Sequence, residues 1–560
     1  MAAANPVLRL PPPAQIAQAV AKIAPADLSK SPLLGILGVI IGAGTVTLTG
    51  RMVTLGLADL KGHLGISFDA GAWIGTTYNM ALMFIGPFTV YLGGLIGPRR
   101  ILFFAATAFT IICMLLPFIH NYSLLLVAIA LAGLTSGTFY PLTLTFALRN
   151  IPLRFLPFTI ALYATFVDGA VNIAPTLYGW YRDHFSWHWM FWNSAVITPV
   201  MMFCIYYGIP ASPAPKRSSE TQTPSFAGFL YASAGFAMLL GAFEQGERLD
   251  WWRSGVFNAL FAGGSFLLLC ALVRRLRSPN PLVDMPYLRR WNTVLLGIGL
   301  FLFRFCLVTT LILVPQSLAI HGFEPDQIGP AVIWSAVPLL LIAFVAALIL
   351  LADLDSRLLL ASGFAFMALA CYLNADVTSA WSASNYYRTE LLMGVGQGFA
   401  FIGLVSSIIL QGIFSGGLSK PQWILTFSAF FHTVRLFGGN LGAVAMGHFI
   451  THQEKLHSNL LGLHVGLGNW ITDGNIQGLA AGMYSHSAGL AAATGRAVGI
   501  ISSRLRLQAY TLSIVDGFYL VVWACVIALL LVALLRRSPL NYGDLSVVQA
   551  TSPAPQEAKS

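Results

Sequence analysis

Long apolar runs return through most of this sequence, and they limit the folds that it can adopt. Runs of about 20 residues, the length that crosses a bilayer as a helix, are separated by short stretches rich in turn-forming or charged residues. With 57% hydrophobic and 9% charged residues, the chain has too much apolar surface for a soluble core. The alternating ten-residue pattern of a membrane barrel is absent from the sequence. We therefore predict an all-α polytopic membrane protein.

The apolar runs predict about fourteen spans in blocks of six, two and six. Such an arrangement indicates two pseudo-repeated six-helix bundles with two inserted helices, and repeats of this kind frame a substrate site near mid-membrane. The predicted segments are an N-terminal segment 1–32, a first bundle 33–209, a linker 210–225, the inserted spans 226–275, a second bundle 291–535 that includes an extracytoplasmic loop 451–512, and a tail 536–560.

Basic residues determine the expected orientation. The net charge of +10 comes largely from Lys and Arg clusters in alternate short loops, which is the positive-inside pattern of cytoplasmic loops. This places both termini in the cytoplasm and the chain in the inner (plasma) membrane, among membrane lipids. Because the basic residues do not follow one face, we expect no nucleic acid as a partner.

The sequence contains few elements of enzyme chemistry. All six cysteines fall within predicted spans, and there is no CxxC pair or cysteine–histidine cluster. The phosphate-binding pattern GxxxxGK[ST] and any Ser/His/Asp arrangement are also absent from the sequence. We therefore expect no enzyme activity, no cofactor and no metal, so that an ion gradient is the available energy source.

Charged residues inside the predicted spans are the strongest indication of function. Asp168 lies in the apolar stretch 158–180, and Arg51, Arg304 and Arg435 have similar settings. A lone ion at bilayer depth costs roughly 2.5–3.5 kcal/mol on insertion scales, so such residues should face each other or water. A buried carboxylate binds a proton when it is desolvated and releases it beside a cation. We predict that Asp168 carries protons; the alternative is a static salt bridge with Arg51.

The arginines inside the spans are predicted to have different roles beside Asp168. Arg51 and Arg435 are predicted to take part in proton coupling, together with His432, which lies one turn before Arg435 on the same helix face. Arg304 has apolar residues on either side and is predicted to bind substrate. Because these arginines outnumber the carboxylate, anionic or zwitterionic substrates are favoured over lipophilic cations. Structural roles remain the alternative, above all for His432.

Aromatic and helix-bending residues complete the candidate site. Three tyrosines are predicted to line a cavity for large amphipathic compounds, although a place in the interfacial belt is the alternative: Tyr78, Tyr140 and Tyr163. Three residues near Asp168 give its span kink points that suit gating, with plain packing as the alternative: Gly169, Pro175 and Gly179.

Several motifs follow one another along the chain. They occupy residues 57–65 and 72–78, the Gly97-Pro98-Arg99-Arg100 turn, residues 172–175 and 186–192, and residues 434–442. Together they resemble fourteen-span drug:proton antiporters of the EmrB/QacA type, which belong to the major facilitator superfamily. The resemblance implies the major facilitator fold and assigns Gly97, Arg99 and Arg100 to the loop motif between spans two and three.

The sequence also departs from this family. The carboxylate usual in span one falls at Thr49, the acidic position of the loop motif at Leu95, and the arginine of span four at Ile129. The proton carrier has therefore moved, or coupling differs.

The prediction is a secondary active exporter of amphipathic small molecules, of the multidrug-efflux type, that works by proton antiport. A metabolite, siderophore or lipid transporter of the same fold is one alternative, and a non-transporting receptor or scaffold is another. The long segment 451–512 further predicts contact with a periplasmic adaptor protein.

Overall fold

The computed structural model describes residues 32–142, 155–208, 226–277, 289–352, 354–414, 421–466, 468–487, 489–537 and 542. The predicted N-terminal segment 1–32 lies outside the described residues apart from residue 32, as do the predicted linker 210–225 and the predicted tail apart from residues 536, 537 and 542.

All the secondary structure that the model describes is helical, which confirms the predicted fold class. Twelve helical stretches among the described residues are long and apolar enough to cross a membrane. Helices α4 (Phe68–Ile96) and α19 (Pro421–Gly462) run beside them through the bundle, which brings the candidate spans to fourteen.

The helices of the first half and of the inserted pair come first along the chain. The first half consists of α2 (Pro32–Leu55), α3 (Leu57–Leu64), α4, α5 (Pro98–Leu115), α6 (Tyr122–Ser136), α8 (Leu156–His184) and α9 (Trp189–Gly208). The inserted pair is α10 (Phe226–Gly246) and α11 (Gly255–Arg277), joined by the 3-10 turn η3 (Trp251–Arg253).

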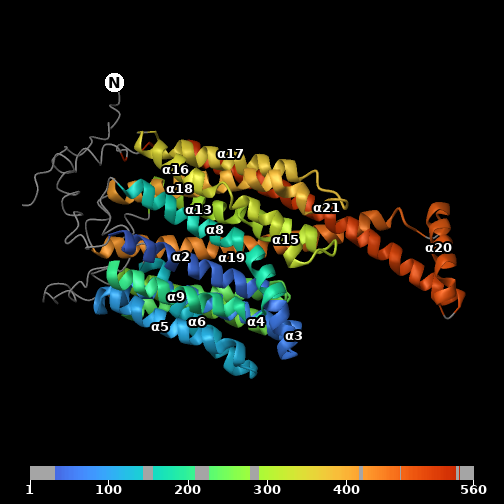
Figure 1. Cartoon of the computed structure of the whole chain (residues 1–560), viewed down its shortest axis with the longest axis horizontal. Coiled ribbons are helices and arrows are strands. Elements are labelled where there is room, and N and C mark those ends of the chain that lie inside the picture. The colour runs from blue at the N-terminus through green and yellow to red at the C-terminus, as the bar shows by residue number, and fades with distance from the viewer. Residues whose placement is uncertain are drawn as a thin grey trace, which may run out of the picture.

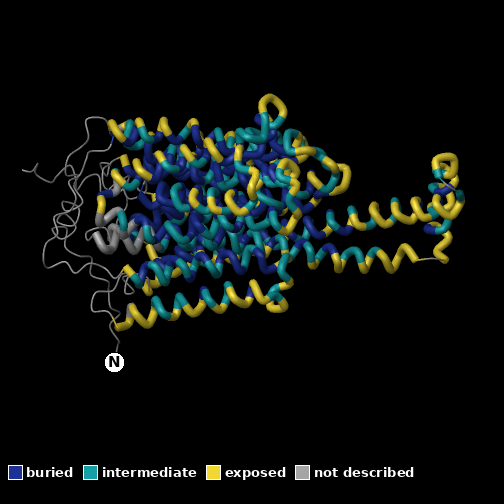
Figure 2. Tube along the Cα trace, turned by 90° about the horizontal axis from the view of Figure 1, so that it is seen from below, coloured by how far each residue is buried: buried dark blue, intermediate teal, exposed yellow. Residues whose placement is uncertain are grey.

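The second half has more interruptions. It contains α13 (Trp291–Cys306), the π-helical turn η4 (Thr309–Leu313), α14 (Val314–Ala319), α15 (Pro325–Val332), α16 (Leu339–Leu351), α17 (Ser356–Asn374), α18 (Tyr387–Phe414), α19, α20 (Trp470–Met483) and α21 (Leu490–Leu534). Apolar residues of both halves form one large core cluster, which Figure 2 shows as the buried interior of the bundle, while α10 and α20 contribute to two small separate clusters.

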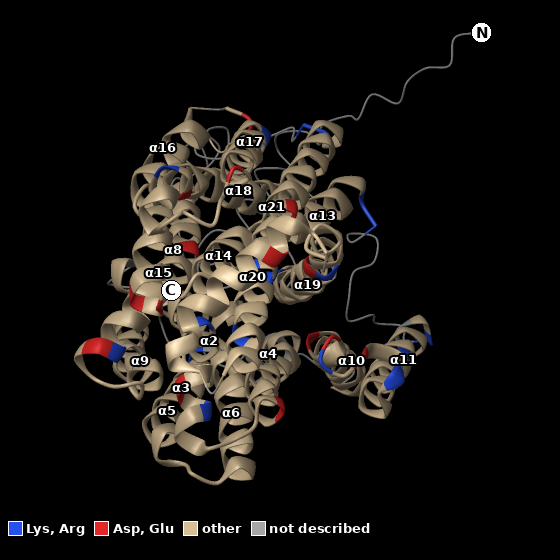
Figure 3. Cartoon of the chain, turned by 90° about the vertical axis from the view of Figure 1, so that its right-hand side faces the viewer, with Lys and Arg blue, Asp and Glu red and all other residues tan. Residues whose placement is uncertain are grey.

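Seen along its long axis, the bundle divides into two groups of helices, with α10 and α11 set apart at one edge (Figure 3). Two helices join the groups: α8 packs on α15, α16 and α18, and α19 packs on α4. The seam between the halves therefore runs along α8 on one side and along α4 and α19 on the other.

The segment 451–512, which is predicted as an extracytoplasmic loop, is helical over most of its described length. Helix α19 continues to Gly462 and α21 already begins at Leu490, so both project from the bundle as an arm that α20 closes (Figure 1). A hydrogen-bonded pair, His457 Nε2 to Asp516 Oδ2 at 2.7 Å, holds the two long helices together near the arm's base. The polar residues that argued against spanning are thus compatible with helices outside the bundle.

Close helix packing depends on glycine where α6 meets α4. A Cβ added to Gly133 would lie 2.5 Å from the carbonyl oxygen of Tyr78, and one added to Gly137 would lie 2.4 Å from Ile85 Cγ2. The first of these contacts is with backbone, which cannot move aside without shifting α4.

We predict that Gly133→Val destabilises the protein by about 1–3 kcal/mol, because overpacking forces the two helices apart. Thermal unfolding of the purified protein in detergent measures this. Gly75→Val is the matched control. Gly75 also lies on α4, but a Cβ added there meets no atom within 4 Å. Equal melting temperatures for both variants would contradict the packing argument.

Candidate functional site

Asp168 occupies the centre of the candidate site. It lies in the middle of α8, is 1% exposed, and neither carboxylate oxygen has a hydrogen-bond partner. The charges that act on it are those of Arg304 on α13 and Arg435 on α19, yet neither guanidinium lies within 4 Å of the carboxylate. An ionised carboxylate in this position is compensated only across a gap, which makes its charge state sensitive to small movements of either arginine.

Arg435 links the two halves of the bundle. Its guanidinium carbon lies 3.6 Å from the ring centroid of Tyr140, and its Nη2 donates to Thr47 Oγ1 at 3.4 Å. Tyr140 belongs to the span Tyr122–Leu142 and Thr47 to α2, so both partners come from the first half. A cation over an aromatic face gains more when it is desolvated, as it is here.

Two further residues extend this cluster. The ring of Tyr163 on α8 lies 5.7 Å from that of Tyr140, and the ring of His432 lies 6.1 Å from it. His432 also packs against Gly86 of α4, where an added Cβ would lie 2.1 Å from the imidazole. The structure thus brings together Asp168 with Arg304, Arg435, His432, Tyr140 and Tyr163 of the predicted set; we call these six residues the central cluster.

Glycines of α19 position Arg304. A Cβ on Gly439 would lie 2.9 Å from Arg304 Nη2, and one on Gly438 would lie 3.2 Å from Phe301 Cα. These glycines therefore let α13 approach α19 closely and leave room for the guanidinium between the two helices. The sequence analysis noted this motif only through its resemblance to a family.

Arg51 is not part of the central cluster. Its Nη2 donates instead to the carbonyl oxygen of Leu311 at 2.8 Å, and no ion pair with Asp168 forms. Leu311 lies in the π-helical turn η4, where the backbone hydrogen-bond pattern is interrupted and a carbonyl is available. The alternative of a static Arg51–Asp168 salt bridge is therefore not what this structure shows; Arg51 joins the halves through the backbone of η4.

The other predicted residues lie in packed surroundings. Tyr78 shares a 3.0 Å hydrogen bond with Ser136. Pro175 stands inside the continuous helix α8, and a Cβ on Gly179 would lie 2.8 Å from the Cα of Asp326, so that glycine allows α8 to contact α15. Gly169 meets only Leu339 Cδ1 at 3.8 Å, which leaves it free of such crowding.

The loop motif and the family departures lie elsewhere in the first half. Gly97 has a φ of 98° and caps α5, and Arg99 donates to the carbonyl oxygen of Tyr206 at 2.8 Å, while Arg100 is exposed. Thr49 shares a 2.6 Å hydrogen bond with Ser194, and Ile129 is fully buried. The side chain of Leu95 lies outside the described residues.

A polar chain that the sequence did not predict crosses the seam. Asn172 Nδ2 on α8 donates to Gln397 Oε1 at 2.8 Å, and Gln397 Nε2 donates to Thr310 Oγ1 at 2.9 Å. Asn172 lies one turn from Asp168, so this chain runs beside the central cluster. Neutral amides inside a span are a weaker signal than charges, which explains why sequence reasoning passed over Gln397.

Glu390 on α18 is a second buried carboxylate without hydrogen-bond partners. It is 0% exposed, and neither oxygen has a hydrogen-bond partner. Its position at the start of a span suggests an interfacial anchor, but tertiary packing encloses it. Such a group is most stable in its neutral form.

Ion pairs close the seam at the end that carries the arm. Arg182 at the end of α8 lies 2.6 Å from Glu324 and 3.5 Å from Asp326, at the beginning of α15. Here α8 and α15 also pack closely through Gly179 and Gly329. The described residues thus hold the two halves together on the arm side.

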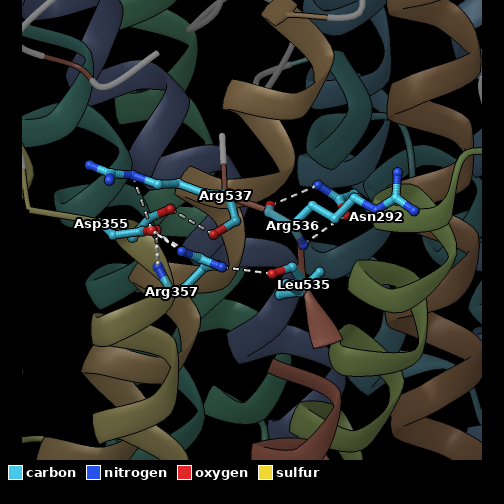
Figure 4. A network of polar contacts seen from close by, with 8 residues as sticks. Asn292, Asp355, Arg357, Leu535, Arg536 and Arg537 are labelled. Atoms are coloured by element: carbon cyan, nitrogen blue, oxygen red, sulfur yellow. Dashed lines mark hydrogen bonds and ion pairs between the residues drawn. The ribbon is translucent and has the colours of Figure 1, made fainter. Parts of the chain in front are cut away.

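A polar network joins three helix ends of the second half at the opposite end (Figure 4). Asp355 accepts hydrogen bonds from the backbone and side chain of Arg357, whose Nη1 donates to the carbonyl oxygen of Leu535 at 2.7 Å. Asn292 exchanges two hydrogen bonds with the backbone of Arg536. Burial disfavours the ionised form of Asp355, but these bonds from Arg357 outweigh it and hold the pKa of Asp355 below its ordinary value.

Because the pKa of Asp355 is lower in the folded protein, its ionisation stabilises the fold above the ordinary Asp pKa of about 3.9, and this contribution is lost as the pH falls through the folded value. We predict that Asp355→Asn lowers stability at neutral pH by about 1–3 kcal/mol and flattens the acid side of the stability profile. Melting temperatures from neutral to acidic pH measure both effects.

Asp250→Asn provides the control, because Asp250 pairs with Arg253 in an exposed salt bridge that contributes little. A profile for Asp355→Asn that runs parallel to the wild-type profile would contradict the role of its ionisation.

The fold and the intramembrane cluster define a polytopic membrane transporter. A family model described as Major Facilitator Superfamily matches residues 39–443, which is more than half of the chain, and the chain belongs to that superfamily.

Named relatives agree with this membership at low identity. The chain is 24% identical over 411 residues to the fatty acid resistance protein FarB of Neisseria gonorrhoeae, covering 72% of this chain and 78% of FarB. It is 22% identical over 488 residues to the multidrug export protein EmrB of Escherichia coli (strain K12), covering 84% and 89%. Among solved structures, the proton:xylose symporter XylE matches with a TM-score of 0.56 and 10% identity over 94% of this chain and 99% of that chain, which supports the fold.

Proposed function

We propose that this protein exports amphipathic small molecules across the inner membrane in exchange for protons. The relatives named for multidrug export and for fatty acid resistance support export of amphiphiles. The observation that carries the coupling mechanism is Asp168, a fully buried carboxylate without a hydrogen-bond partner that two arginines from the other half face across a gap.

The mechanism follows from moving the two halves relative to each other. When Arg304 and Arg435 approach Asp168, its ionised form is stabilised and a proton leaves; when they withdraw, desolvation favours the protonated form. Alternating access about the central site changes these distances, because Asp168 belongs to the first half and both arginines to the second. The proton is thus bound in one conformation and released in the other.

The charge of the substrate determines the direction of coupling. A neutral or cationic group placed against Asp168 competes with the proton, which produces exchange. An anion that binds Arg304 or Arg435 favours a protonated Asp168 and would travel in the same direction as the proton. Exchange therefore requires the substrate to place a neutral or positive group at Asp168, and a zwitterion can meet this while its anionic group pairs with an arginine.

Transport in proteoliposomes tests this proposal. We expect an imposed pH gradient to drive flux of amphiphiles through the wild type, and Asp168→Asn to reduce that flux to the level of protein-free vesicles while substrate binding persists. The panel contains anionic, neutral, cationic and zwitterionic compounds, so that the sign of the accompanying proton flux identifies the group at Asp168.

Asp376→Asn, at an exposed position in the loop after α17, is the matched control and should transport normally. Coupled flux that survives in Asp168→Asn would reject Asp168 as the carrier. No flux of any compound through a folded wild type would favour the receptor or scaffold interpretation.

We also propose that the end of the bundle opposite the arm faces the cytoplasm, with both termini. Arginines predominate there: Arg99, Arg100, Arg274, Arg277, Arg289, Arg290, Arg357, Arg536 and Arg537, against Asp355 among the described residues. This asymmetry follows the positive-inside rule. The arm then extends into the extracytoplasmic space.

The arm is proposed to contact a periplasmic adaptor protein. Its outer surface presents large apolar side chains to solvent, including Leu460, Leu463, Trp470 and Leu490, with exposed fractions from 50% to 82%. Exposed apolar residues that gather on one projecting element are typical of interaction sites.

Replacing residues 462–493 with a short Gly/Ser turn tests this role. We expect flux in proteoliposomes to persist, because the arm lies outside the bundle, and export across the whole cell envelope to be lost. Intact export across the envelope would reject the adaptor contact, and lost flux in proteoliposomes would assign the arm to transport itself.

A further inference from the structure

The inserted helix α10 lies against the seam between the two halves. It packs on α4 of the first half, on α19 of the second half and on its own partner α11. Figure 3 shows α10 and α11 beside α4, apart from both groups of helices. Any movement that opens this seam must therefore change the contacts of α10.

Toward the first half, α10 presents a carboxylate from within its membrane span. Asn79 Nδ2 of α4 donates to Glu244 Oε1 at 2.8 Å. The neighbouring Gln245 donates to the carbonyl oxygen of Ala72 at 3.1 Å and to Thr76 Oγ1 at 2.5 Å. Glu244 thus has a neutral donor as its partner, rather than a cation.

Toward the second half, the next turn of α10 contacts α19. Glu247, three residues after Glu244 and on the same helix face, accepts a hydrogen bond from His448 Nδ1. The side chains of Glu247 and His448 are 40% and 51% exposed, so both reach water at the arm end. Trp251 covers His448 edge-on, with ring centroids 5.9 Å apart.

The cations near this site have other partners. Arg248 donates from Nε to Gln245 Oε1 at 2.6 Å and from Nη1 to Asp69 at 2.9 Å, and its guanidinium lies over Trp73. Arg253 pairs with Asp250 at 3.0 Å. On α11, the arginines Arg274 and Arg277 lie at the opposite end of the helix. His448 is therefore the basic group that bonds Glu247, just after the end of α10.

An apolar layer separates Glu244 from the central cluster. One turn from Glu244 and Asn79, the buried residues Leu240, Ala237 and Met83 form a separate apolar cluster with Phe437 and Leu436 packed against it. Asn79 and the Gly86 that contacts His432 are seven residues apart on α4, about 10 Å along the helix. A proton at Glu244 thus has polar partners toward the arm end and apolar neighbours toward Asp168.

We propose that Glu244 is a second proton-binding site, separate from Asp168 and loaded from water on the arm side through His448 and Glu247. The proton passes from the imidazolium of His448 to the carboxylate of Glu247 and then to Glu244, one turn deeper, which leaves His448 neutral and Glu247 ionised until water supplies His448 with another proton. Arrival of the proton neutralises Glu244, while its departure leaves an anion held by Asn79.

Because α10 lies at the seam between the two halves, proton binding at Glu244 can affect how the halves move relative to each other. Through Glu244 and Glu247, α10 binds the first half at Asn79 and the second half at His448. The bond to His448 is strongest when the imidazole is protonated and Glu247 ionised. Movement of a proton from His448 to Glu244 weakens this link and allows α19 to leave α4 on the arm side.

Infrared difference spectroscopy tests the site directly in the purified full-length protein, without substrate. Carboxylic acids and carboxylates absorb at different frequencies, so a pH titration reports each buried carboxyl that changes state. We expect a protonated-carboxyl band that is lost in Glu244→Gln and retained in Asp168→Asn. Asn79→Ala should shift the frequency of that band, because it removes the donor to Glu244 Oε1, and this provides a readout if Glu244→Gln folds poorly.

The route is tested by the exchange of this band in deuterated water. We expect slower exchange in His448→Ala and normal exchange in His452→Ala, which changes a nearby histidine of α19. A spectrum of folded Glu244→Gln that superimposes on that of the wild type would overturn the site, as would a band unmoved in Asn79→Ala. Unchanged exchange in His448→Ala would overturn the route. This proposal depends neither on the substrate nor on proton-driven export. If export in proteoliposomes fails, the infrared band of Glu244 still tests the proposal.

Discussion

Polar groups that cross an otherwise apolar seam hold the two halves of this protein in register. Arg435 reaches Tyr140 and Thr47, Arg51 reaches the backbone of η4, and Asn172 reaches Gln397. Without water, each such group must find its partner in the protein, because an unsatisfied polar group in hydrocarbon costs several kcal/mol. The same groups would lose partners if the halves separated, so relative movement of the halves is coupled to their charge and protonation.

Within this framework, the two acidic sites differ in their surroundings. Asp168 is sealed in the centre, where only distant cations compensate it, whereas Glu244 has an amide partner and a path to water along α10. In the proposal made above, the apolar layer between them lets each bind a proton from its own side. A transporter that has lost the usual carboxylate of span one, here Thr49 bonded to Ser194, can in this way retain acid groups at the moving seam.

The number and order of the spans could be predicted from the sequence, because lipid imposes a length and an apolar composition on every helix that crosses it. Asp168, Arg304 and Arg435 were recognisable for the same reason, since charges are rare in such helices. Which charges face each other was not predictable. A static salt bridge between Arg51 in span one and Asp168 in span five was the alternative to proton coupling, but Arg51 bonds the carbonyl of Leu311, which is available only where η4 departs from α-helical geometry.

Local composition was also insufficient for Glu244 and for the arm. Glu244 stands near the end of a span, where a carboxylate is expected to reach water, and only the packing of α10 on α4 brings Asn79 against it. The polar segment 451–512 read as a loop, although its helices are stabilised by each other outside the bundle, as His457 and Asp516 illustrate. The sequence by itself determined the class of fold, the spans and the rare buried charges, because the solvent acts on each segment separately. The tertiary structure decided the partners of those charges, because partners come from helices far apart in the chain and depend on how closely glycines such as Gly439 let those helices approach.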